Sequence, residues 1–187
     1  MAGNLVNVAE ISRKSQIPAI TLHRYLALFQ TLFIVNIQPS WSPNLGLRFV
    51  KSPKLYLLDS GLLAHLLGIN LQQALDKPIL MGSVIENFII NELSKQATWS
   101  PMRVNIHHYH TVNGIEVDIV LENRAGYVVG IEVKSSENVR PSDFNGLKSL
   151  KEKVGEKFVK GVVLYQGSQI TPFGADLFAL PISSLWS

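Results

Sequence analysis

Residues 115–136, IEVDIVLENRAGYVVGIEVKSS, decide the fold class of this chain. Apolar and polar residues alternate on both sides of segment 122–126, a pattern that predicts two strands joined by a turn. Cross-strand neighbours approach within about 5.5 Å, so Asp118 and Glu132 are expected side by side in this hairpin. Lys134 is expected on the face of Glu132, because strand side chains repeat every second residue. Two carboxylates in an apolar hairpin need a partner, a metal ion or a proton.

The spacing D-x13-E-x-K in this hairpin resembles the PD-(D/E)XK nuclease superfamily. The resemblance implies that Asp118 and Glu132, with the carbonyl of Val133, hold Mg²⁺ or Mn²⁺. It also implies that Lys134 stabilises charge at a scissile phosphate. Val117 stands where the superfamily name has proline. The motif is short and degenerate, so an alternative stays open, namely a relic site in a fold kept for binding.

The composition predicts a globular protein, because 47% of the 187 residues are hydrophobic, enough for a packed core. The chain has no cysteine, which excludes disulfides, thiolate zinc sites and a cysteine nucleophile. It has neither a charged-then-apolar secretory leader nor an uninterrupted apolar run of about 18 residues. The sequence therefore predicts a cytoplasmic protein that does not contact a membrane.

The net charge of +3 is unevenly distributed along the chain. Residues 1–54 hold six basic residues and one acidic residue, so they carry +5 and the remaining 133 residues carry −2. This asymmetry predicts two units, the first of which faces a polyanion or an acidic protein partner. DNA is the expected polyanion. The residues expected to contact it are Arg13, Lys14, His23, Arg24, Arg48 and Lys51.

The first unit, residues 1–54, has the pattern of a small winged helix-turn-helix domain. A short helix is expected to end near Ser15, and the proline after it suits the first turn of the next helix. Apolar residues recur at steps of three and four over residues 19–32, which predicts that second helix. Segments 33–37 and 47–51 suit the two strands of a wing. The alternative is a helical pair that only packs on a neighbouring domain.

A connecting helix and linker are predicted over residues 55–81. Asp59 or Ser60 can cap the helix, and Gly68 can end it. Segment 71–81 is expected to be a linker with a loose helix. The next segment, 82–96, is predicted to be an amphipathic helix. Its expected buried stripe is Val84, Ile85, Phe88, Ile89 and Leu93.

Residues 82–187 are predicted to form one α/β domain, a mixed sheet with flanking helices. After the hairpin come a helix over 141–154, a buried strand over Phe158–Tyr165 and a last short strand in the tail. His107, His108 and His110 fall in the strand before the hairpin. Without cysteine or a second acidic pair nearby, they are expected to lie at a strand edge and to touch phosphate rather than zinc.

The order of these segments resembles the C-terminal half of a bacterial and archaeal family of AAA-type ATPases, a domain of unknown function with a restriction-endonuclease-like fold. The resemblance implies an ATPase module before Met1. This chain has no G-x-x-x-x-G-K-[ST] loop, so it is not the ATP-hydrolysing part. The resemblance also gives Glu86 a place in the metal site. The alternative for Glu86 is a solvated first-turn glutamate favoured by the helix dipole.

The function expected from the sequence is to bind or cleave DNA with Mg²⁺, together with an upstream ATPase. The competing hypothesis is a catalytically inactive nuclease-like fold that binds nucleic acid or assembles with protein. A nuclease acting on RNA is a third hypothesis, which the residues do not separate from the first.

Overall fold

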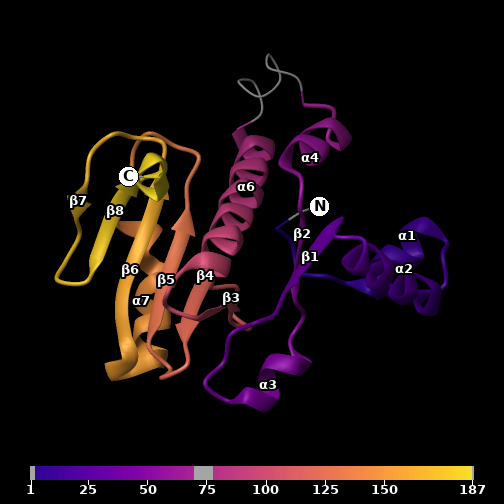
Figure 1. Cartoon of the computed structure of the whole chain (residues 1–187), viewed down its shortest axis with the longest axis horizontal. Coiled ribbons are helices and arrows are strands. Elements are labelled where there is room, and N and C mark those ends of the chain that lie inside the picture. The colour runs from indigo at the N-terminus through magenta and orange to yellow at the C-terminus, as the bar shows by residue number, and fades with distance from the viewer. Residues whose placement is uncertain (1–2, 70–77, 187) are drawn as a thin grey trace.

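The computed structural model describes residues 3–69 and 78–186, which contain a six-stranded mixed sheet (Figure 1). The strands of this large sheet are β3 (Val104–His110), β4 (Glu116–Asn123), β5 (Val128–Val133), β6 (Phe158–Tyr165), β7 (Thr171–Pro172) and β8 (Leu177–Pro181). Their order in space is β3-β4-β5-β6-β8-β7. β5, β6 and β8 run parallel, whereas β3, β4 and β7 are antiparallel to their neighbours. The predicted mixed α/β fold class is confirmed at this level.

The hairpin predicted from residues 115–136 is present as β4 and β5. Ile119 pairs with Ile131, and the antiparallel register continues toward the turn. The side chain of Asn123 accepts hydrogen bonds from the backbone amides of Ala125 and Tyr127, at 3.0 and 2.9 Å. Gly126 has a φ of 81°, a left-handed conformation that glycine adopts without steric cost. Local turn chemistry therefore closes the hairpin where the sequence predicted it.

Helix α7 (Asn145–Val154) packs on one face of the large sheet, directly after the 3₁₀ turn η1 (Pro141–Phe144). Leu147 and Leu150 are fully buried against that face. A Cβ atom at Gly130 of β5 would lie only 2.7 Å from Leu147 and 2.8 Å from Leu150. The helix can approach the sheet this closely because the strand has no side chain there.

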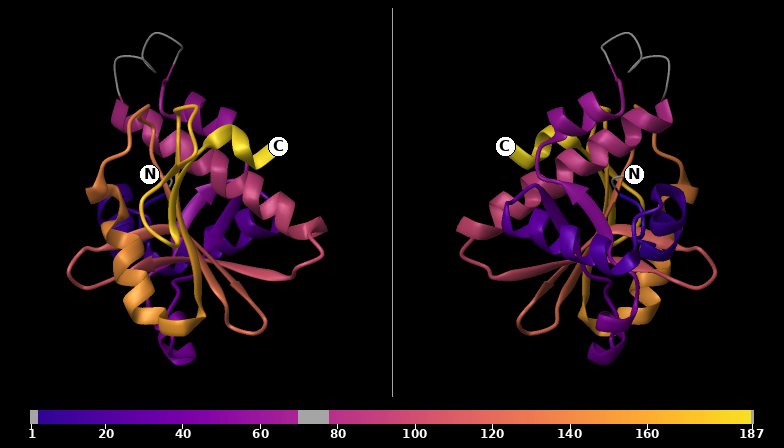
Figure 2. Two further views of the ribbon diagram at one scale, coloured as in Figure 1. Left: turned by 90° about the vertical axis from the view of Figure 1, so that its left-hand side faces the viewer. Right: turned by 90° about the vertical axis from the view of Figure 1, so that its right-hand side faces the viewer.

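Helix α6 (Pro78–Trp99) packs on the opposite face of the sheet (Figure 2). It is longer than the predicted 82–96 helix, because it also includes residues 78–81, which were predicted to belong to the linker. Ile85, Ile89 and Leu93 are buried, as expected. Phe88 was expected in the same stripe but is 39% exposed and lies against Trp186, with ring centres 5.8 Å apart. The rest of the predicted linker, residues 70–77, lies outside the described residues.

The N-terminal elements lie on the other side of α6 from the large sheet (Figure 1). They are α1 (Val8–Ser15), α2 (Ala19–Thr31), β1 (Val35–Gln38), α3 (Leu45–Val50), β2 (Lys54–Leu57) and α4 (Ser60–Leu66). The predictions for α1, α2 and α4 agree with these bounds within a few residues. Asp59 caps α4, accepting a hydrogen bond from the amide of Leu62 at 2.6 Å.

The predicted second wing strand, residues 47–51, is wrong. This segment belongs to helix α3, whose first turn is capped by Asn44 through a 2.9 Å hydrogen bond from the amide of Gly46. The strand that pairs with β1 is β2, in an antiparallel β1–β2 ribbon. β2 spans the predicted boundary between residues 54 and 55. The ribbon therefore connects the two predicted units.

Two short 3₁₀ segments complete the described chain, η2 (Gly155–Lys157) before β6 and η3 (Ile182–Trp186) after β8. Within the part of the chain that the structure describes, no helix has both the length and the apolar character needed to cross a bilayer.

Candidate functional site

A β-bulge in β4 determines the direction of the Asp118 side chain. Val117 lies opposite Tyr109 of β3 and Val120 lies opposite His107, so β4 has one residue more than β3 between these pairs. Val117 and Val120 both pack on the α7 side of the sheet. The extra residue therefore turns the two residues between them, Asp118 and Ile119, to the α6 side.

Both carboxylate oxygens of Asp118 accept hydrogen bonds. Oδ2 accepts from the backbone amide of Val133 at 3.0 Å, across the point where the backbone pairing of β4 and β5 ends. Oδ1 accepts from Nζ of Lys54 at 3.1 Å. One oxygen is thus fixed by the neighbouring strand and the other by a lysine from β2.

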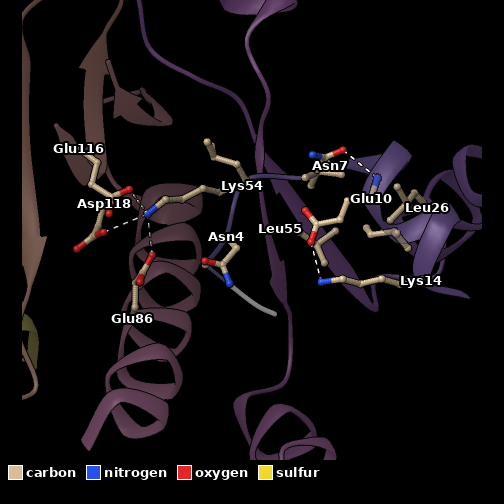
Figure 3. Close-up of a pocket in the computed structure, with 14 residues that line it drawn as sticks. Asn4, Asn7, Glu10, Lys14, Leu26, Lys54, Leu55, Glu86, Glu116 and Asp118 are labelled. Carbon is tan, nitrogen blue, oxygen red and sulfur yellow. Dashed lines mark hydrogen bonds and ion pairs between the residues drawn. The ribbon is translucent and has the colours of Figure 1, made fainter. Parts of the chain in front are cut away.

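The ammonium group of Lys54 lies among carboxylates from two different elements (Figure 3). Besides Asp118, it is 3.1 Å from Oε1 of Glu86 on α6 and 3.9 Å from Oε2 of Glu116 on β4. Its side chain is only 3% exposed. A buried lysine stays charged only if opposite charges compensate for its desolvation, and these carboxylates do so.

The same cluster borders a pocket of about 720 Å³ between the sheet and α1. Lys54, Glu86, Glu116 and Asp118 line one end, and the first residues of the described chain and of α1 line the other (Figure 3). Lys14 of α1 lies at the far rim and pairs with Glu10. A ligand in this pocket would meet three acidic side chains whose charge Lys54 balances only in part.

Polar side chains of α6 fix β2 in this position. Tyr56 donates a 2.6 Å hydrogen bond from its hydroxyl to Oε1 of Glu86. Asn87 pairs with both backbone groups of Leu57 at 2.9 Å, and Asn91 donates to the same carbonyl at 2.7 Å. The face of α6 away from the large sheet is therefore polar and specific for β2.

Glu132 and Lys134 form a separate pair beside this cluster. Nζ of Lys134 donates to Oε1 of Glu132 at 2.9 Å, so the expectation that they share a face is confirmed. Ile131 and Val133 pack in the α6 cluster, so the side chains that alternate with them point to the α7 side of β5. Asp118 points to the α6 side. Asp118 is nevertheless close enough to Glu132 for its charge to raise the pKa of that carboxyl, so the expectation that the two carboxylates lie near each other stays a prediction.

Burial and mutual repulsion raise the pKa values of two of these carboxyl groups. Burial, and then the charge of Asp118, raise the pKa of Glu86 to about 7 against the opposing effect of Lys54. The same two causes raise the pKa of Glu132 to about 8. Burial alone would lower the pKa of Lys54, but Asp118 and Glu86 raise it above its usual value. The lysine is therefore protonated at neutral pH.

The acidic groups have the chemistry that a hard divalent cation prefers, but their arrangement does not suit one. Carboxylate oxygens are the ligands that Mg²⁺ prefers, and Oε2 of Glu132 is buried without a hydrogen-bond partner among the described residues. Both oxygens of Asp118, however, are engaged by protein donors. Across residues 3–69 and 78–186, no group of three or more His, Asp or Glu side chains is arranged to hold a metal ion. In this conformation the predicted ligands do not fit a divalent cation.

Comparison with known proteins assigns both halves of the chain to sequence families. Residues 81–185 match the model of a family described as a domain of unknown function (DUF4143), which covers more than half of the chain. Residues 1–73 match a family described as a domain of unknown function (DUF8612). The chain belongs to the DUF4143 family.

The DUF8612 match ends after α4, and the DUF4143 match begins within α6. Two curated relatives are the uncharacterized proteins Rv2008c of Mycobacterium tuberculosis and Mb2031c of Mycobacterium bovis, each 27% identical over 183 residues. These matches cover 98% of this chain, which spans about 40% of the length of either relative. No solved structure matches the chain. The nuclease-like fold and the winged helix stay predictions.

Two basic residues that were expected to bind DNA contact the DUF4143 region instead. Arg48 forms a bidentate pair with Glu122, donating from Nη2 at 2.9 Å and also from Nη1. Its guanidinium group lies 5.6 Å from the ring centre of Trp41. Lys51 donates to the backbone carbonyl of His110 at 3.2 Å. Together with Lys54, three of the six basic residues in residues 1–54 therefore contact the DUF4143 region. The excess positive charge of residues 1–54 is thus partly neutralised within the chain.

The other expected DNA-contacting residues, Arg13, Lys14, His23 and Arg24, are exposed on α1 and α2. They share this surface with apolar side chains, because none of the side chains of α2, all of which the structure describes, is buried. Phe33, just after the helix, is 80% exposed. The exposed apolar residues of this α2 surface are Ile20, Tyr25, Leu28, Phe29, Leu32 and Phe33.

Two of the three histidines of β3, His107 and His108, are buried structural residues. His108 is fully buried, and its Nε2 lies 3.2 Å from the backbone carbonyl of Ser52. Burial lowers its pKa to about 3 and also lowers the pKa of His107, so both rings are neutral at pH 7. The expectation of a phosphate contact is wrong for these two residues.

Sequence analysis missed several residues of the site, above all Lys54, Tyr56 and Glu116. A lysine and a tyrosine two residues apart in the strand-like run KLYL share one face, which was the available signal for a polar partner. Asn87 and Asn91 were also missed. Their spacing of four, next to the apolar stripe of this helix, placed them on one face, where buried amides require hydrogen-bond partners.

Proposed function

We propose that this chain is a nuclease-like binding module that works with an AAA-type ATPase module and does not hydrolyse phosphodiesters in the conformation described. The observation that supports this function is the position of Lys54, which supplies positive charge to Asp118 and Glu86 at 3.1 Å from each. The proposal takes up the alternative that the sequence left open, a nuclease-like fold kept for binding.

Protein is the proposed partner rather than DNA. The α2 surface is apolar and exposed, whereas Arg48, Lys51 and Lys54 are engaged within the chain. Exposed apolar patches of this kind are typical of protein contacts. The proposed occupant is the ATPase module, which the resemblance puts before this region and which would lie next to α1 and α2 in the chain.

A cleavage assay tests the catalytic part of this proposal. The pure chain is incubated with plasmid, linear, branched and single-stranded DNA and with RNA, in Mg²⁺ or Mn²⁺. We expect no cleavage beyond that of the matched variant Asp118→Asn, which removes a charge and hardly changes volume. Metal-dependent cleavage by the wild type that Asp118→Asn abolishes would overturn the proposal.

The second candidate is Mg²⁺-dependent hydrolysis of DNA or RNA in another conformation. Two observations favour it, the buried and unpartnered Oε2 of Glu132 and the ammonium of Lys134 beside it. This function requires Lys54 to leave Asp118. Cleavage that appears only when the ATPase module is joined to this chain would support the second candidate over the first.

A further inference from the structure

We infer that Lys54 is a built-in cation of the carboxylate site, and that its removal converts the site into one that binds a single divalent metal ion. This inference extends the proposed function and rests on it. Both take the carboxylates around Lys54 to be the functional site. It concerns the ligand that the acidic groups accept, which can be measured without any cleavage.

The contacts of Lys54 are those of a bound cation rather than of a surface ion pair. Its Nζ atom is within 3.1 Å of oxygens from Asp118 and Glu86, which come from different elements, and the side chain is 3% exposed. An exposed pair such as Lys14 with Glu10, at 77% and 45% exposure, has no comparable enclosure. The fold therefore brings these carboxylates together around one positive charge.

The backbone that carries Lys54 is held independently of that charge. Gln38 of β1 pairs with Lys54 in the β1–β2 ribbon, and Asn87 fixes Leu57 at the other end of the strand. Removing the ammonium group alone should leave β2 in place. The oxygens of Asp118 and Glu86 would then face a vacated volume at one end of the 720 Å³ pocket, which a hydrated ion can enter.

An independent observation points to an unmet need for positive charge at this place. Glu132, beside this cluster, is 8% exposed, and its Oε2 atom has no hydrogen-bond partner among the described residues. Buried carboxylates are normally paired or bound to metal. Lys54 and Lys134 satisfy this requirement only in part, and a divalent ion in place of Lys54 would satisfy it better.

The ammonium group of Lys54 and a divalent metal ion should not occupy this site at the same time. An ammonium group and a divalent ion that share the oxygens of Asp118 would lie within a few ångströms of each other, where like charges repel strongly in a poorly hydrated site. Mg²⁺ and Mn²⁺ also need several oxygen ligands, and Lys54 engages one oxygen on Asp118 and one on Glu86. The wild type is therefore expected to bind these ions weakly.

The test is titration of Mn²⁺ into the folded chain, followed by calorimetry and by the decrease of the free-ion electron paramagnetic resonance signal. Lys54→Met removes the charge and keeps most of the side-chain volume. We expect it to bind one Mn²⁺ per chain at least about tenfold more tightly than the wild type. Lys54→Arg, which keeps the charge, and Lys54→Met with Asp118→Asn, which removes a ligand, should bind as weakly as the wild type.

A second variant covers the case in which Lys54→Met does not fold. Lys54→Gln also removes the charge, keeps both Asp118 and Glu86, and can still donate a hydrogen bond to them, so Mn²⁺ should raise its melting temperature while leaving that of the wild type unchanged. Folded variants that bind Mn²⁺ no more tightly than the wild type would overturn the inference and leave Lys54 a purely structural residue. Metal-dependent cleavage by the wild type would instead overturn the proposed function, and the titration would still decide the role of Lys54.

Discussion

Lys54 and Asp118 are 64 residues apart in the sequence, and their charged atoms lie 3.1 Å apart. The lysine belongs to the β1–β2 ribbon, in the part of the chain matched by DUF8612, and the aspartate belongs to the DUF4143 region. This ion pair therefore links the two family regions at the place where the sequence predicted a metal ion.

Replacing Lys54 by methionine should destabilise the protein strongly. Breaking a buried ion pair by removing one partner leaves the other charge uncompensated, which costs about 3–5 kcal/mol. Urea unfolding at pH 7 measures this decrease in stability. Lys14→Met is the matched control, since it breaks an exposed pair and should leave the unfolding free energy nearly unchanged. Equal effects of the two substitutions would mean that Lys54 does not hold the two regions together.

The pair of Arg48 and Glu122 should require arginine specifically. Lysine cannot donate two parallel hydrogen bonds to one carboxylate or stack on Trp41 in the same way, so Arg48→Lys should lower the unfolding free energy by about 1–3 kcal/mol. Arg13→Lys, at an exposed position on α1, is the control. A double-mutant cycle with Glu122→Gln should give a coupling energy, and its absence would contradict the role assigned to this pair.

Protonation of His108 should oppose folding in mild acid. Its pKa is about 3 in the folded state, from a usual value of 6.5, so the unfolded chain binds the proton more readily between these values. The contribution of His108 to the unfolding free energy should therefore fall by about 2 kcal/mol between pH 7 and pH 5, while the raised pKa values of Glu86 and Glu132 act in the opposite direction. His108→Gln removes this contribution, so the unfolding free energy of the variant relative to the wild type should rise by about 2 kcal/mol between pH 7 and pH 5. An unchanged difference between variant and wild type at these two pH values would show that His108 makes no such contribution.

DNA binding should be weak and should involve few phosphates. Only Arg13, Lys14 and Arg24 are expected to contribute, and the slope of log K against log[salt] should decrease by roughly 0.9 for every phosphate that the protein no longer neutralises. Fluorescence anisotropy with a labelled duplex should therefore show a smaller slope for the triple variant Arg13→Gln, Lys14→Gln and Arg24→Gln. Arg48→Met should not change the slope, because Arg48 is engaged by Glu122. Tight, sequence-dependent binding of DNA would contradict the proposal that the partner is a protein.

The parts of the fold that depend on local pattern were predictable from the sequence. Strands β4 and β5 follow from alternation, and their turn follows from an asparagine and a glycine in the required positions. Helix α3 was mistaken for a strand because its apolar residues form a run too short to have a clear period. The deciding signal was Asn44, whose cap to Gly46 begins the helix.

The site was only partly predictable, because its geometry depends on contacts distant in sequence. Glu86, Asp118, Glu132 and Lys134 were all identified as candidates, and Glu132 and Lys134 lie on the same face as expected. The bulge that turns Asp118 toward Lys54 depends on the register between β4 and β3, which alternation within one strand does not determine. The role of Lys54 depends on a partner 64 residues away.

The most direct test of the central claim is a crystal structure of the wild-type chain soaked in Mn²⁺, with anomalous diffraction data collected at the manganese edge. We expect no anomalous peak beside Asp118, with the ammonium of Lys54 still between Asp118 and Glu86. A strong peak bonded to Asp118 and Glu132, with Lys54 displaced, would contradict this claim.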